Sequence, residues 1–172
     1  LIQEPGNTTS TISATSIQFV GLSMGVIIGL IMGFSSPLLA LWVGEDYEYL
    51  SPLLCLMVGH LSINLTVLPL FSINSAYNKV KIPGIVSLVS GILNLFLAIL
   101  LATTFNLKLY GIALASLIIL TLKNVFFLPL YTSYIMGLKK LFFYKPMSSG
   151  FIVMLLTLFL TYIIQLQITI NS

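Results

Sequence analysis

The first apolar run of the chain, SIQFVGLSMGVIIGLIMGFSSPLLALWV at residues 16–43, decides the fold because it carries no charged side chain. A helix of about 20 such residues crosses the roughly 30 Å hydrocarbon core of a bilayer. Four more apolar runs follow, so the sequence predicts an all-α, polytopic transmembrane helix bundle. The expected spans cover residues 16–43, 51–71, 83–104, 109–130 and 148–168.

The composition argues against a soluble domain and against an outer-membrane barrel. Hydrophobic residues make up 58% of the 172 residues and charged residues only 6%. A soluble bundle or a barrel would need polar residues at regular spacing along every element, and the apolar runs lack them. Because the charges lie almost wholly between the runs, the net charge of +3 reflects membrane topology and indicates no nucleic-acid partner.

The lysines predict how the chain is oriented in the cell (cytoplasmic) membrane. If the start of the first span is cytoplasmic, the acidic loop at residues 44–50 lies outside, together with Lys108. The other lysines between spans then lie inside, as the positive-inside rule expects. These inner lysines are Lys79, Lys81, Lys139, Lys140 and Lys145.

The ends of the sequence predict that the chain is part of a longer protein. Residues 1–15 form a polar segment rich in serine and threonine, and residues 16–172 form the transmembrane domain. An odd number of spans places the two ends on opposite sides of the membrane. We therefore expect further transmembrane segments as partners of these five.

Small residues recur at helical spacing in three of the expected spans. Regular spacing of this kind favours close helix packing in lipid, where van der Waals contact drives association. Two interpretations stay open: tight static packing, or an interface along which helices slide or hinge. The expected packing residues are Gly21, Gly25, Gly29 and Gly33 in the first span, Gly84 and Gly91 in the third, and Gly111 in the fourth.

Polar side chains at membrane depth are the candidates for substrate binding or ion coupling, because each is costly unless it faces protein or water. They are His60, Asn64, Asn94, Lys123 and Asn124. A histidine here is either hydrogen-bonded between helices or available for proton coupling or substrate contact. For Asn94, which lies on the small-residue stripe of the third span, interhelical hydrogen bonding is expected.

The depth of Lys123 in the membrane allows two roles for its side chain. It lies about 21 Å along the fourth span from Leu109, which leaves about 9 Å of hydrocarbon before the cytoplasmic face. The side chain can snorkel most of that distance to the headgroups. Alternatively, it lines a polar cavity and meets an anionic group.

Catalytic and metal-binding patterns are missing from the sequence. There is no metal-ligand cluster, phosphate-binding glycine loop or nucleophile–base pair, so we expect no enzyme, no metal and no cofactor. Cys55 is the single cysteine and forms no disulfide within the chain.

Four stretches resemble the multidrug, oligosaccharidyl-lipid and polysaccharide exporter superfamily. The run SGILNLFLAILL at residues 90–101, followed by YGIALAS at 110–116, resembles paired helices near the end of its polysaccharide exporters. The stretch LLALWVGEDY at residues 38–47 is similar to the family's helix end and outer loop. NSAYNKVKIP at residues 74–83 is similar to its cytoplasmic loop. The chain departs from the family in a turn, residues 105–108, that lacks glycine, and it contains no arginine.

The resemblance implies part of a MATE-like flippase lobe, matching the ninth to thirteenth helices of a longer exporter. It implies export of a lipid-linked oligosaccharide or polysaccharide repeat unit by alternating access, as in lipopolysaccharide and other polysaccharide biosynthesis. Two alternatives remain: a cation-coupled multidrug antiporter of the same superfamily, and a non-transporting membrane scaffold subunit.

Overall fold

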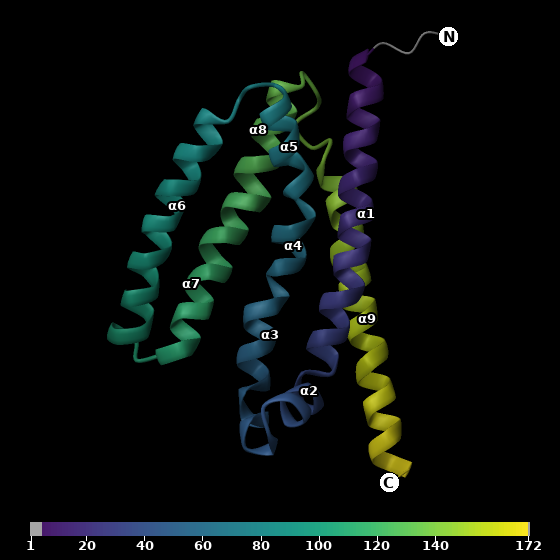
Figure 1. Cartoon of the computed structure of the whole chain (residues 1–172), viewed down its shortest axis with the longest axis vertical. Coiled ribbons are helices and arrows are strands. Elements are labelled where there is room, and N and C mark those ends of the chain that lie inside the picture. The colour runs from purple at the N-terminus through teal and green to yellow at the C-terminus, as the bar shows by residue number, and fades with distance from the viewer. Residues whose placement is uncertain (1–4, 172) are drawn as a thin grey trace.

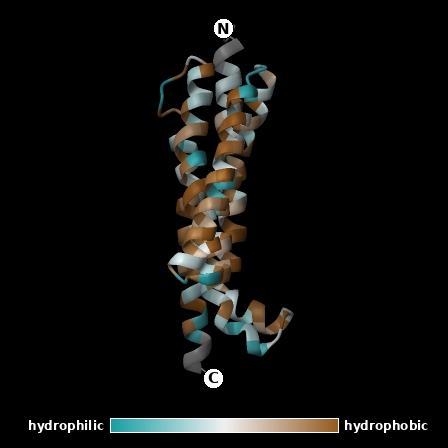
Figure 2. Cartoon of the chain, turned by 90° about the vertical axis from the view of Figure 1, so that its left-hand side faces the viewer, coloured by the Kyte–Doolittle hydropathy of each residue, from teal (hydrophilic) through white to brown (hydrophobic). Residues whose placement is uncertain are grey.

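The computed structural model describes residues 5–171, and it describes their side chains over residues 8–167. Within the described residues, five helices are long and apolar enough to cross a membrane, which confirms the all-α, five-span prediction. Hydrophobic residues occupy the middle of the bundle, and hydrophilic residues concentrate at its two ends (Figure 2). The five spans are Thr8–Gly33, Glu45–Ala76, Lys81–Thr104, Lys108–Ile135 and Tyr144–Gln167.

The first span differs from the prediction at both of its ends. Helix α1 (Pro5–Gly33) already includes most of the polar segment at residues 1–15. The hydroxyls of Ser13 and Ser16 donate to the carbonyls four residues earlier, so the helix satisfies these side chains internally. At the other end, the helix is interrupted at Phe34, and the chain continues as α2 (Ser35–Trp42), which turns away from the bundle (Figure 1).

The second span consists of four consecutive helical pieces rather than one helix. They are η1 (Glu45–Leu50), α3 (Ser51–Gly59), α4 (Leu61–Thr66) and α5 (Leu68–Ala76). Pro69 explains the interruption at Val67, between α4 and α5, since proline removes a backbone donor and crowds the preceding turn. The span also continues past the expected end at residue 71, which brings Asn74 inside a helix.

The third and fourth spans form a hairpin that also contains irregular backbone. The third comprises α6 (Lys81–Ile99) and the π-helix η2 (Leu100–Thr104). The fourth comprises α7 (Lys108–Leu122), the π-helix η3 (Lys123–Phe127) and α8 (Leu128–Ile135). In the turn between them, Asn106 has a φ of 55°, a left-handed conformation that asparagine tolerates where glycine is missing.

The fifth span, α9 (Tyr144–Asn171), runs beside α1 at one side of the bundle (Figure 1). Across the molecule the order is third, fourth and second span, followed by the first and fifth together. The fourth and second spans therefore lie in the centre. The loops that carry Lys79 and Lys139 lie at one end, called here the lysine end, and Glu45–Leu50 lies at the other, called the acidic end.

The glycine stripe of α1 is the surface on which α9 packs. A Cβ added at Gly29 would lie 2.7 Å from Thr157 Cβ, and one added at Gly150 would lie 2.7 Å from Gly21 Cα. Gly25 and Gly33 approach Gly150 and Thr161 in the same way. Successive α1 glycines meet successive α9 residues, so the two helices run parallel with their backbones in close contact.

For Gly84 and Gly91, close helix packing stays a prediction. A Cβ added at either position would meet nothing within 4 Å in the described part of the chain. The fourth span contacts the adjacent edge of the same helix face, where Ser87 meets Lys123 and Asn94 meets Ser116. By contrast, Gly111 is tightly packed, because a Cβ there would lie 2.7 Å from Ala102 N.

Candidate functional site

Asn64 and Asn124 form a hydrogen bond in the centre of the bundle. The Asn124 amide donates to Asn64 Oδ1 at 2.9 Å, and the two side chains are only 6% and 9% exposed. Each carboxamide has two donors and one acceptor oxygen, so a single bond leaves capacity on both. Asn64 Nδ2 and Asn124 Oδ1 have no partner among the described residues.

A second bond joins the same two spans nearer the lysine end. Thr132 Oγ1 lies 3.1 Å from Asn74 Oδ1 and 2.9 Å from Leu128 O, so its one proton is shared between these two acceptors, and Asn74 is 1% exposed. We call Asn64, Asn74, Asn124 and Thr132 the polar seam. Sequence analysis missed Asn74 and Thr132, because the second span was expected to end at residue 71 and the fourth at 130.

The polar seam and its surroundings hold six buried polar side-chain atoms that lack a partner in the described part of the chain. Buried polar groups in native proteins are nearly all hydrogen-bonded, so such atoms indicate contact with water or with a polar ligand. They lie only on the second and fourth spans. They are Ser62 Oγ, Asn64 Nδ2, Asn74 Nδ2, Thr121 Oγ1, Asn124 Oδ1 and Ser133 Oγ.

Lys123 points sideways toward the third span. Its ammonium lies 3.5 Å from Ser87 Oγ and 5.7 Å from the centroid of the Phe71 ring. Ser87 is six residues into the third span, or roughly 9 Å along it from Lys81. The Lys123 side chain is half-buried between the third and fourth spans, and its ammonium has one long hydrogen bond for three donors in the described part of the chain.

His60 and Asn94 lie nearer the acidic end and approach the fourth span from opposite sides. The Asn94 amide donates to Ser116 Oγ at 3.3 Å, which places this side chain in an interhelical contact. His60 occupies the break between α3 and α4, with its Nδ1 3.4 Å from Leu56 O. His60 and Ser116 both line a mainly apolar cavity of about 260 Å³ between α3 and α7.

The irregular backbone at Lys123 and Asn124 has a local cause. Pro129 has no N–H to donate to the carbonyl of Val125, and its ring crowds that carbonyl in a regular α-helix. The helix widens to π-geometry over η3, where Leu128 N bonds to Lys123 O five residues earlier. Single π-turns of this kind are frequent at functional sites.

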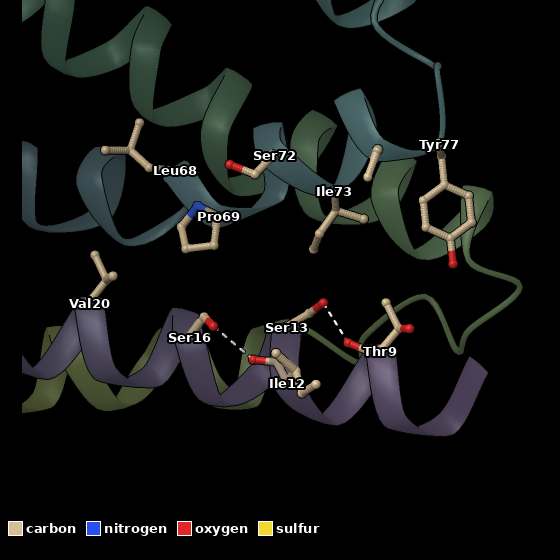
Figure 3. Close-up of a pocket in the computed structure, with 11 residues that line it drawn as sticks. Thr9, Ile12, Ser13, Ser16, Val20, Leu68, Pro69, Ser72, Ile73 and Tyr77 are labelled. Carbon is tan, nitrogen blue, oxygen red and sulfur yellow. Dashed lines mark hydrogen bonds between the residues drawn. The ribbon is translucent and has the colours of Figure 1, made fainter. Parts of the chain in front are cut away.

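A larger cavity, about 570 Å³, lies elsewhere, between α1 and α5 near the lysine end (Figure 3). Hydroxyl groups of Thr9, Ser13, Ser16 and Ser72 line it beside apolar side chains. The Ser13 and Ser16 hydroxyls already donate to carbonyls of their own helix, as the dashed lines show. We therefore place the candidate site at the fourth span and not at this cavity.

These features define a multi-pass membrane protein with polar groups buried between its central spans. The chain is 40% identical over 139 residues to the uncharacterized membrane protein EpsK of Bacillus subtilis (strain 168). The match covers 78% of this chain and 28% of EpsK, so the chain spans about a quarter of the length of that relative. No family model matches the sequence, and no solved structure matches it.

Proposed function

We propose that the chain is the five-span part of a flippase that exports a lipid-linked oligosaccharide or polysaccharide repeat unit. The sequence resemblance and the kinship with a membrane protein support this role. Its activity needs no catalytic group, only a polar path through the bilayer and helices that rearrange around it. We further propose that the lysine end faces the cytoplasm.

The observation that carries the proposal is the position of Lys123. Its half-buried side chain reaches Ser87 on the third span, and no carboxylate occurs in the described parts of the five spans beyond the acidic loop. A cation at membrane depth without an ion-pair partner is costly, so a binding site for an anionic group accounts for it. The phosphate groups of a lipid-linked sugar supply that charge.

The polar seam supports the same proposal in a second way. A carbohydrate carries hydroxyls that both donate and accept, and they match the unpartnered atoms of Asn64 and Asn124. Deleting the full-length gene tests the function directly. Lipid-linked oligosaccharide should accumulate in the cell membrane while surface polysaccharide falls. Unchanged levels of both would refute the flippase role, and a gain in drug sensitivity instead would favour the multidrug antiporter.

A further inference from the structure

Pro37 and Pro129 each leave a backbone carbonyl without its usual donor. In an α-helix, each carbonyl accepts from the N–H four residues later, and proline has none. Pro37 therefore leaves Gly33 O without that donor, and Pro129 does the same to Val125 O. One proline lies where α1 breaks from α2, and the other follows the π-helix η3.

Both carbonyls accept a side-chain hydrogen bond from the fifth span. Gln165 Nε2 donates to Gly33 O at 2.7 Å, and the Tyr144 hydroxyl donates to Val125 O at 2.7 Å. The two donors are 21 residues apart, roughly 32 Å along α9. Helix α9 thus supplies the donors for both carbonyls, one from each of its two ends.

We propose that Tyr144 and Gln165 are positioning residues through which the fifth span holds the bends of the fourth and first spans. Val125 lies in the same π-turn as Asn124, so the Tyr144 bond fixes the turn that presents Asn124 to Asn64. The Gln165 bond fixes the point where α2 leaves α1. The effect of these bonds on transport rests on the proposed function, but the bonds themselves do not.

The role of the Tyr144 hydroxyl can be separated from the packing of its ring. The ring is half-buried and lines a small cavity of about 150 Å³ with Ser62 and Thr66. If only the ring mattered, Tyr144→Phe would be silent. If the hydroxyl replaces the donor that Pro129 removes, its value depends on the proline: Pro129→Ala restores an N–H and makes the hydroxyl redundant.

A double-mutant cycle in the full-length protein tests this dependence. We expect Tyr144→Phe to lower the thermal midpoint of the detergent-purified protein by at least about 2 °C. In the Pro129→Ala background, the same change should have no effect. Hydrogen exchange should rise at residues 125–131 in Tyr144→Phe alone. Tyr162→Phe is the matched control on α9, because Tyr162 is 62% exposed.

A parallel cycle with Gln165→Met and Pro37→Ala keeps the test available if one proline variant fails to fold. The inference would be overturned if the side-chain substitution lowered the thermal midpoint equally with and without the proline. It would also be overturned if neither Tyr144→Phe nor Gln165→Met changed the thermal midpoint. Neither readout involves transport. If the cycle shows the dependence on proline but Tyr144→Phe exports lipid-linked sugar normally, the positioning role stands and the π-turn does not limit transport.

Discussion

Asn124 donates to Asn64 Oδ1 at 2.9 Å and joins the two central spans through side chains that are more than nine-tenths buried. Hydrogen bonds between transmembrane helices contribute about 0.6 to 2 kcal/mol each. The same bond holds two carboxamides that each keep an unpartnered atom within the described structure. The pair thus combines a structural contact with the capacity to bind a polar ligand.

This pair predicts a non-additive effect on stability. Asn124→Leu should destabilise the full-length protein by about 1–3 kcal/mol, because it leaves the Asn64 carboxamide buried without a partner. Adding Asn64→Leu should recover part of that loss, since both buried polar groups are then gone. Thermal unfolding in detergent measures the cycle. Strictly additive losses would show that the two side chains do not interact.

The glycine stripe predicts opposite results for two alanine substitutions. Gly29→Ala places a Cβ 2.7 Å from Thr157 Cβ, so α9 must move away and folded protein should decrease. Gly91→Ala is the matched control, because its Cβ meets nothing within 4 Å and alanine favours the helix by about 1 kcal/mol. Fluorescence-detected size-exclusion chromatography compares the yields. A harmless Gly29→Ala would contradict the α1–α9 packing.

The lysine asymmetry predicts that the two ends of the bundle face different compartments. Single cysteines at Glu48 and Lys79, both exposed, should react with an impermeant thiol reagent from opposite sides, Glu48 from outside. The experiment uses a Cys55→Ala background, because Cys55 is the single cysteine of the 172 residues. Reaction of both cysteines from one side would refute the topology.

Substitution of Lys123 should reduce transport without reducing the stability of the protein. Lys123→Met keeps most of the side-chain bulk and should leave insertion intact or improved while export of the lipid-linked sugar falls. Lys123→Arg should keep part of the activity, because charge is what the contact needs. Export is measured in cells at matched protein level. Wild-type export from Lys123→Met would remove this residue from the site.

The five helices could be predicted because long uncharged runs have few structural alternatives in a membrane protein. Their ends could not, because Ser13 and Thr15 bond to carbonyls of α1 itself, and α5 and α8 continue beyond the apolar runs. For this reason Asn74 and Thr132 were missed. The contact between Ser87 and Lys123 and the open face at Gly84 depend on helix rotation, which a single sequence does not specify.

The central claim is that the full-length protein moves lipid-linked oligosaccharide across a bilayer. The most direct test reconstitutes it into vesicles with lipid-linked oligosaccharides extracted from the cells that carry it, and follows oxidation of the glycan by impermeant periodate. The account predicts that glycan of the inner leaflet loses its protection in vesicles with the wild-type protein and keeps it with Lys123→Met. Full protection of the inner-leaflet glycan in the presence of folded wild-type protein would contradict the account.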